Sequence, residues 1–282
     1  MALPEGFDLD EFVSRTLAED LGTAGDVTSN ATIAEDARFT AGMNSRGQIV
    51  IAGLEIAAAF FRKLDPKVEI EALVSDGDRV AVGASLMRLS GNARAMLAAE
   101  RSALNALQHL SGIATFTRQY VDEIAGTGAT LLDTRKTIPG LRVLEKYAAR
   151  MGGAHNHRMQ LDDGVLIKDN HVAVCGGVAE AVRRAKAANT GLQVQVEVDR
   201  IDQIEPALAA GADRLLLDNM DPAMLREAVA LVNKRVPLEA SGGVTLETIR
   251  FIAETGVNFT SVGRITQSAP SVDIGLDYSI SR

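Results

Sequence analysis

The hydrophobic positions follow two different patterns in the two parts of the chain. In roughly the first ninety residues, the segments 38–51, 68–74 and 85–89 have strand-like patterns, and 68–74 alternates apolar and polar side chains. Residues 9–21 and 54–64 instead repeat apolar side chains at helical spacing, and Asp8 precedes the first helix at the spacing of a capping box. The polar stretch 19–29 is interpreted as a loop. These elements predict a small α+β layer in which antiparallel strands pack on helices.

A long helical region extends from residue 92 to about residue 124. Gly112 lies within it, and we expect this glycine to separate two helices or to kink one. At the other end of the chain, Val272, Ile274 and Leu276 alternate with less apolar residues. That period is typical of a strand, and we expect the tail to return and pair with the first domain.

After residue 128, short apolar runs alternate with helical segments, which predicts βα units around a parallel sheet. The runs are 130–132, 165–167, 194–196, 215–217, 237–240 and 259–262, and the expected helices are 141–151, 178–188, 201–210, 222–233 and 246–255. Six clear strands, rather than the eight of a complete barrel, predict a smaller or partly open one. We expect an N-terminal domain of residues 1–110, joined by the tail 268–282, and a barrel domain of residues 111–267.

Composition narrows the class of protein. The 282 residues are 46% hydrophobic and carry a formal net charge of −8, which is typical of a globular chain. The single cysteine, Cys175, allows no intramolecular disulfide and is expected to be a small buried hydrophobe. The first residues lack the basic and apolar runs of a signal peptide, and no uncharged apolar stretch is long enough to span a bilayer. These features predict a soluble, cytoplasmic protein.

One segment, residues 131–171, has the opposite charge from the rest of the chain. Its seven Lys and Arg residues against five Asp and Glu give a local charge of +2, and three of the four histidines lie in it. A nucleic-acid surface needs a broad basic face, so this concentrated group predicts a specific anion pocket.

Polar residues follow each predicted barrel strand, where functional groups of parallel barrels gather. Four of these polar residues are cations from separate segments. They would repel one another unless a multiply charged anion binds between them. Alternatively, each cation could pair with a local acid, for example Lys168 with Asp162 or Asp163. The glycines at 242–243 and 263 allow backbone N–H groups to approach a phosphate, or simply start helices. The cations in question are Arg135, Lys136, Arg158 and Lys168.

Two acids and two histidines complete the candidate chemistry. Glu197 and Asp218 end central strands, so they could form structural ion pairs, bind ribose hydroxyls or coordinate Mg²⁺. His155 and His157 could donate a proton or a hydrogen bond, and they lack the third ligand at a recognisable spacing that a zinc site needs. On the long helix, Arg101 is interpreted as a surface charge, and His109 as structural, from the residues alone.

Seven motifs distributed over the whole chain then point to a family. They are ERSALN, DTRKTIPGLR, GGAHNHRMQLDDGVLIKDNH, VEVD, LLLDN, EASGGV and DIGLDY. With them the sequence resembles the nicotinate-nucleotide pyrophosphorylases (carboxylating), also called quinolinate phosphoribosyltransferases. The resemblance implies an α/β fold, with an N-terminal open sandwich and an incomplete parallel α/β barrel of about seven strands. It also implies a homodimer, or an assembly of dimers, whose active sites are shared between subunits.

The resemblance assigns roles to individual residues. It implies that Arg101 from a neighbouring subunit joins Arg135, His157, Arg158 and Lys168 around quinolinate. The residues implied to bind phosphoribosyl pyrophosphate are Thr134, Lys136, Glu197, Asp218, Ser241, Gly242, Gly243, Val262, Gly263 and Arg264.

Catalysis is implied for Lys136, Glu197 and Asp218, the two acids also meeting Mg²⁺ directly or indirectly. Two positions depart from the family: Ala154 stands where many members have glycine, and Arg264 where many have a small residue.

The implied activity is that of a pentosyltransferase in NAD biosynthesis. It joins quinolinate to phosphoribosyl pyrophosphate and releases pyrophosphate and CO₂, giving nicotinate mononucleotide. The alternatives are a molybdenum-transport-associated paralogue of the same fold, a nicotinate phosphoribosyltransferase, and a non-catalytic protein that binds small anions. The implied partners are therefore small molecules, with no nucleic acid and no membrane.

Overall fold

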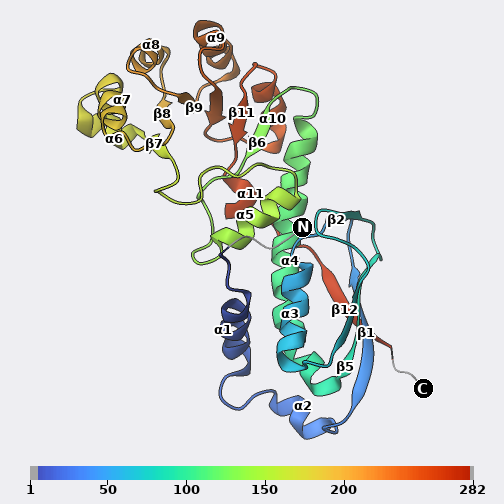
Figure 1. Cartoon of the computed structure of the whole chain (residues 1–282). Helices are drawn as coiled ribbons and strands as arrows, with labels where there is room; N and C mark the ends of the chain where they lie inside the picture. The colour runs from blue at the N-terminus through green and yellow to red at the C-terminus, as the bar shows by residue number, and fades with distance from the viewer. Residues whose placement is uncertain (1–5, 280–282) are drawn as a thin grey trace. The chain divides into compact units, whose positions relative to one another are not determined.

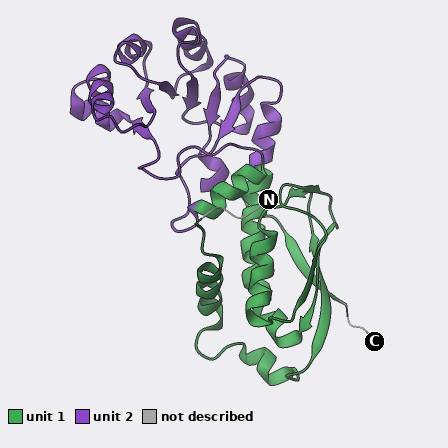
Figure 2. Cartoon of the chain, in the orientation of Figure 1, with its two compact units in different colours: residues 1–116, 143–152, 269–282 green, residues 117–142, 153–268 purple. Residues whose placement is uncertain are grey.

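The computed structural model describes residues 6–279 and divides into two compact units (Figure 2). Unit 1 comprises residues 1–116, 143–152 and 269–282, and unit 2 comprises residues 117–142 and 153–268. Over the described residues, none of the helices combines the length and the apolar composition needed to cross a membrane.

The first helices of unit 1 are fixed by side-chain caps. Helix α1 (Leu9–Leu21) begins as expected, because Asp8 accepts a hydrogen bond of 2.9 Å from the backbone N–H of Glu11. The interpretation of 19–29 as a loop is wrong in its last part. Asp26 accepts from the backbone N–H of Ser29 and caps a second helix, α2 (Val27–Thr32). The available signal was Asp26, an N-cap residue three positions before Ser29.

Unit 1 contains an antiparallel sheet in the order β12 (Ile274–Ser279), β1 (Arg38–Ser45), β5 (Ser85–Asn92) and β3 (Glu69–Ala72). A two-stranded pair, β2 (Ile49–Val50) and β4 (Arg79–Val80), stands apart from it. Figure 1 shows α3 (Leu54–Leu64) and the first part of α4 (Ala93–Glu123) on one side of the larger sheet. The predicted α+β layer is confirmed, and the tail pairs with β1 from Thr40 to Ser45.

Helix α4 is continuous, so the first alternative, two helices separated at Gly112, is wrong. A Cβ atom at Gly112 would lie 2.2 Å from the carbonyl oxygen of Pro270 in the tail. The glycine is therefore required by a close approach of the chain. On the same helix, His109 Nε2 lies 2.9 Å from Oε1 of the buried Glu145 on α5 (Arg142–Met151), as a structural histidine would.

Unit 2 is built on six parallel strands, in the order β6-β11-β10-β9-β8-β7. The strands are β6 (Thr130–Leu132), β7 (Val165–Ile167), β8 (Val194–Val198), β9 (Arg214–Asp218), β10 (Leu238–Ser241) and β11 (Phe259–Ser261). The helices between them are α6 (Asp169–Cys175), α7 (Val178–Ala187), α8 (Ile204–Ala209) after a 3₁₀ turn η1 (Ile201–Gln203), α9 (Pro222–Val232), α10 (Leu246–Ala253) and α11 (Arg264–Gln267). The predicted α/β fold is confirmed; α6 and α11 were not predicted.

The ends of this strand order are β6 and β7, so the sheet is open. A parallel bridge between Leu132 and His155 adds one further strand position beside β6. Six strands and this bridge agree with an incomplete barrel of about seven strands.

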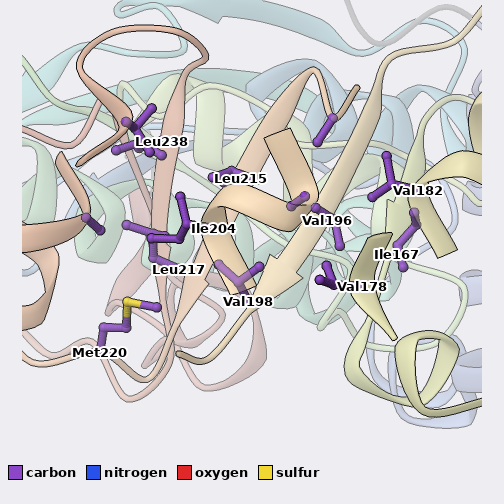
Figure 3. Packing of buried hydrophobic residues seen from close by; sticks show 14 of the residues in the cluster. Ile167, Val178, Val182, Val196, Val198, Ile204, Leu215, Leu217, Met220 and Leu238 are labelled. Atoms are coloured by element: carbon purple, nitrogen blue, oxygen red, sulfur yellow. The ribbon is translucent and has the colours of Figure 1, made fainter. Parts of the chain in front are cut away.

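Alternate residues of the central strands face opposite sides of the sheet. Val196 and Val198 on β8, with Leu215 and Leu217 on β9, pack in one buried cluster with helix residues such as Ile204 (Figure 3). Because side chains alternate along a strand, the residues between them face the barrel interior. These inward residues are Gln195, Glu197, Arg214, Leu216, Asp218, Glu239 and Ser241.

Candidate active site

Unit 2 contains a cavity of about 710 Å³ at the carboxyl ends of its strands. With one exception, all the residues that the sequence assigned to substrates line it: Thr134, Arg135, Lys136, His157, Arg158, Lys168, Glu197, Asp218, Ser241, Gly242, Gly243, Val262, Gly263 and Arg264. The exception is Arg101, which lies exposed on α4 in unit 1. Its contribution to a neighbouring subunit's site stays a prediction.

Buried Asp133 holds two of the cationic segments together. Its Oδ1 accepts a hydrogen bond of 2.8 Å from the backbone N–H of His157, and its own N–H donates to the carbonyl of His155. With the Leu132 bridge, these bonds tie the end of β6 to residues 155–158. Arg135 and Arg158, which follow on the two segments, are thereby placed at the same pocket.

Arg135 disfavours the charge of its neighbour Arg158. Burial and the nearby Arg135 guanidinium lower the pKa of Arg158, and Asp163 only partly opposes them. The Nε atom of Arg135 is itself buried with no hydrogen-bond partner among residues 6–279. Neighbouring cations with unused donors are suited to a ligand with more than one negative charge.

Lys168 does not form the local pairs that were considered for it. Asp163 instead accepts hydrogen bonds from the backbone N–H groups of Met159 and Gln160. The Nζ atom of Lys168 lies 3.5 Å from Oε2 of Glu197, at the end of the neighbouring strand.

Glu197 and Asp218 form an acidic pair at the ends of β8 and β9. Burial raises the pKa of Glu197, and Asp218 adds to this, while Lys168 lowers it. Burial likewise raises the pKa of Asp218, against the opposing effect of Lys168 and Lys136. Two partly desolvated carboxylates are suited to a cation or to hydroxyl donors.

The loops after β9 and β10 approach closely because of one glycine. Gly242 has φ +95°, and a Cβ atom there would lie 2.2 Å from Asn219 Oδ1 and 2.8 Å from the Asn219 backbone nitrogen. At the next loop, a Cβ at Gly263 would lie 2.7 Å from Cδ of Lys136. Both glycines therefore keep the backbone open beside the cavity, where N–H groups can approach an anion.

A buried polar layer below these residues was not assigned any role from the sequence. Glu239 is fully buried; its Oε2 lies 2.7 Å from Arg214 Nη2, 2.8 Å from Gln195 Nε2 and 3.5 Å from His157 Nε2. Asn219, which also lines the cavity, was likewise missed. The available signal was a charged or amide residue within or at the start of each strand, at positions 195, 214 and 239, where burial on both faces is expected.

No three His, Cys, Asp or Glu side chains in the described part of the chain are grouped as a metal site. The acidic pair could supply one or two carboxylate ligands to a divalent cation. Magnesium is commonly bound in this way, by one or two carboxylates, water and substrate phosphates. The donors present fit such a shared site.

Comparison with known proteins agrees with this geometry. Residues 26–111 match the family model described as quinolinate phosphoribosyl transferase, N-terminal domain, and residues 113–277 match that of the C-terminal domain. The nicotinate-nucleotide pyrophosphorylase [carboxylating] of Mycobacterium leprae is 43% identical, over 94% of this chain and 95% of the relative. The probable enzyme of that name from Bacillus subtilis is 41% identical, over 97% and 94%.

A solved structure gives the same result for the fold. The nicotinate-nucleotide pyrophosphorylase from Francisella tularensis superposes with a TM-score of 0.93 and is 40% identical, covering 99% of this chain and all of the other. Family models over both parts, and relatives above 40% identity over nearly the full length, lead to one conclusion. The chain belongs to the quinolinate phosphoribosyltransferase family.

Proposed function

We propose that this protein transfers the phosphoribosyl group of phosphoribosyl pyrophosphate to quinolinate and decarboxylates the product. The observation that supports this most directly is the adjacent pair Arg135 and Arg158, which shares a cavity with the acidic pair Glu197 and Asp218. The two arginines suit a dianionic pyridine, and the two acids suit the hydroxyls of a ribose and a bound Mg²⁺. Related plant proteins carry the name quinolinate phosphoribosyltransferase [decarboxylating].

Arg135, Arg158 and Lys168 bind the two carboxylates of quinolinate. An arginine can hold a carboxylate through two parallel hydrogen bonds, and Lys168 adds a point charge. Arg101 from a second copy of the chain completes this group, so the working unit is a homodimer.

The loops at Ser241–Gly243 and Val262–Arg264 hold the 5-phosphate through backbone N–H groups, with Thr134 beside them. Lys136 lies between this subsite and that for quinolinate. Glu197 and Asp218 accept hydrogen bonds from the ribose hydroxyls and would hold Mg²⁺. The ion supplies charge neutralisation to the pyrophosphate as it leaves.

The chemical steps require no covalent protein intermediate. The pyridine nitrogen of quinolinate attacks C1 of the ribose while the C1–O bond to pyrophosphate breaks and its electron pair leaves with pyrophosphate. Positive charge that develops at the ribosyl centre is stabilised by the nearby carboxylates. The ring nitrogen is then quaternary, so it withdraws the electron pair released when the 2-carboxylate leaves as CO₂. Protonation of C2 gives nicotinate mononucleotide.

The test is an assay with quinolinate, phosphoribosyl pyrophosphate and Mg²⁺. Formation of nicotinate mononucleotide supports the proposal, whereas turnover of nicotinate but not quinolinate contradicts it. A protein that binds both anions without turnover would be the non-catalytic alternative. The cytoplasmic location stays a prediction, since related plant proteins are named as chloroplastic or mitochondrial.

A further inference from the structure

Four side chains form a layer beside the proposed quinolinate subsite, because Glu239 contacts Gln195, Arg214 and His157. Arg214, Gln195 and Glu239 are inward residues of three neighbouring strands, and strand register places Gln195 beside Arg214. The guanidinium of Arg214 also stacks over the ring of Phe259, 3.9 Å from its centroid. Glu239 and His157 both line the cavity itself, so this layer forms part of its floor.

The hydrogen bonds of His157 define its tautomer. Its Nδ1 accepts a bond of 2.8 Å from the backbone N–H of Arg158, so Nδ1 has a lone pair and no proton. In the neutral ring the proton is then on Nε2, which faces Glu239 Oε2 at 3.5 Å. Nδ1 therefore contacts the backbone of Arg158, and Nε2 contacts the carboxylate of Glu239.

Glu239 is the acceptor that favours this arrangement. Burial raises its pKa, but the hydrogen bonds from His157 and Gln195 and the charge of Arg214 lower it. The 2.7 Å contact with the Arg214 guanidinium stabilises the ionised carboxylate. Its Oε1 is buried without a hydrogen-bond partner among residues 6–279. A buried carboxylate directly below an anion subsite would repel the ligand unless Arg214 neutralised it, which the 2.7 Å contact accomplishes.

We propose that Glu239 is a positioning residue for quinolinate. It holds the His157 ring with Nε2 protonated, and the ring in turn fixes the backbone of Arg158, whose side chain binds a substrate carboxylate. His157 then acts through Arg158 and is not a proton donor. The effect on quinolinate rests on the function proposed above, whereas the tautomer of His157 does not.

Two double variants distinguish the effect of the hydrogen-bond acceptor at position 239 from the effect of the charges of Glu239 and Arg214. Glu239→Gln/Arg214→Met removes both charges but keeps an oxygen that can accept from His157. Glu239→Met/Arg214→Met removes the charges and the acceptor. Replacing a buried ion pair as a unit avoids an unpaired charge, so both variants are expected to fold with similar Tm values.

The first measurement is nuclear magnetic resonance of the ring nitrogens in protein labelled at histidine. The parent and the Gln variant should show His157 with a slowly exchanging proton on Nε2 only, and in the Met variant the Nε2 proton, having lost its acceptor, should exchange faster with solvent. A parent ring protonated at Nδ1 would overturn the proposal, whether or not the protein turns over quinolinate.

The second measurement compares the two KM values. The Met variant should raise the KM for quinolinate about ten- to hundredfold, as loss of partners that orient metal-binding histidines does, and the Gln variant should stay near the parent. The KM for phosphoribosyl pyrophosphate should change less than twofold in both. Equal quinolinate KM values in the two variants, or an equal rise for both substrates, would reject a positioning role. Failure of the parent to use quinolinate would instead reject the proposed function.

Discussion

Lys168 Nζ and Glu197 Oε2 lie 3.5 Å apart at the ends of the neighbouring strands β7 and β8. The lysine belongs to the group proposed to bind quinolinate, and the glutamate to the group proposed to bind ribose and Mg²⁺. This ion pair therefore joins the two subsites. Lys168 also lowers the pKa of Asp218, so its charge favours ionisation of both acids.

Lys168→Met should shift the pH dependence of catalysis. Burial raises the pKa of Glu197 and Lys168 lowers it, so removing the lysine raises this pKa further. The acid limb of kcat/KM for phosphoribosyl pyrophosphate, measured at saturating quinolinate, should move to higher pH. Lys186→Met, which removes an ion pair 3.0 Å long with Asp213, is the matched control. An unmoved limb in Lys168→Met would mean that the pair does not set the ionisation of Glu197.

The double variant Glu197→Gln/Asp218→Asn should gain stability at neutral pH while losing activity. Folding raises both pKa values through burial, so the stability from these groups is present below their unfolded values, near 4, and is lost as pH rises through the folded values. At pH 7 the variant should have the higher Tm, and the difference should vanish below about pH 4.

The effect of Mg²⁺ on Tm is a second test of the acidic pair Glu197 and Asp218. With phosphoribosyl pyrophosphate present, Mg²⁺ should raise the Tm of the parent more than that of the double variant. An equal rise would show that the ion is bound by substrate alone. The loss of activity should be on the order of 10²–10³ in kcat/KM if the carboxylates stabilise the ribosyl centre.

Arg135→Ala and Lys168→Ala should each weaken quinolinate binding by ~2–5 kcal/mol, because each removes a charged partner of the dianion. Arg135→Ala should not destabilise the free protein, since it relieves the repulsion that lowers the pKa of Arg158. Calorimetric titration measures the first effect and thermal unfolding the second. Arg183→Ala, on the exposed face of α7, is the control. An affinity for quinolinate equal to that of the parent in both site variants would contradict the proposal that Arg135 and Lys168 bind its carboxylates.

Gly242→Ala and Gly243→Ala should separate backbone strain from steric clash in the proposed phosphate loop. Both glycines have positive φ, which costs an alanine ~1–2 kcal/mol, but a Cβ meets no atom within 4 Å at Gly243. At Gly242 the clash with Asn219 adds ~1–3 kcal/mol and displaces the loop. Gly242→Ala should therefore lose more stability and more affinity for phosphoribosyl pyrophosphate. Equal losses would mean that the close approach to Asn219 is unimportant.

The parallel sheet and its ligand edge were predictable because strand composition and strand ends are local features. Short apolar runs ending in Lys168, Glu197 or Asp218 identify both the sheet and the residues at its carboxyl edge. The role of Gly112 was not predictable in this way. Its reason is the carbonyl of Pro270, more than 150 positions further along the chain, and a helix pattern contains no information about that contact.

The buried layer shows a different limit. Glu239 stands in an apolar strand, which signals a special environment, but its partners come from β8, β9 and the segment before β7. Sequence spacing does not show which strands are neighbours in a barrel, so the connection to His157 needed coordinates. Arg101 presents the same problem across subunits: its exposure on α4 agrees with a surface charge and with a contact to a second chain.

The central claim is that one cavity binds a pyridine diacid beside an activated ribose and removes one carboxylate. It is tested most directly with two samples of quinolinate, one labelled in the 2-carboxylate and one in the 3-carboxylate. We expect labelled CO₂ only from the first sample, only when phosphoribosyl pyrophosphate is present, and in equal amount to nicotinate mononucleotide. Release of label without phosphoribosyl pyrophosphate, or no release while pyrophosphate still forms, would contradict the account.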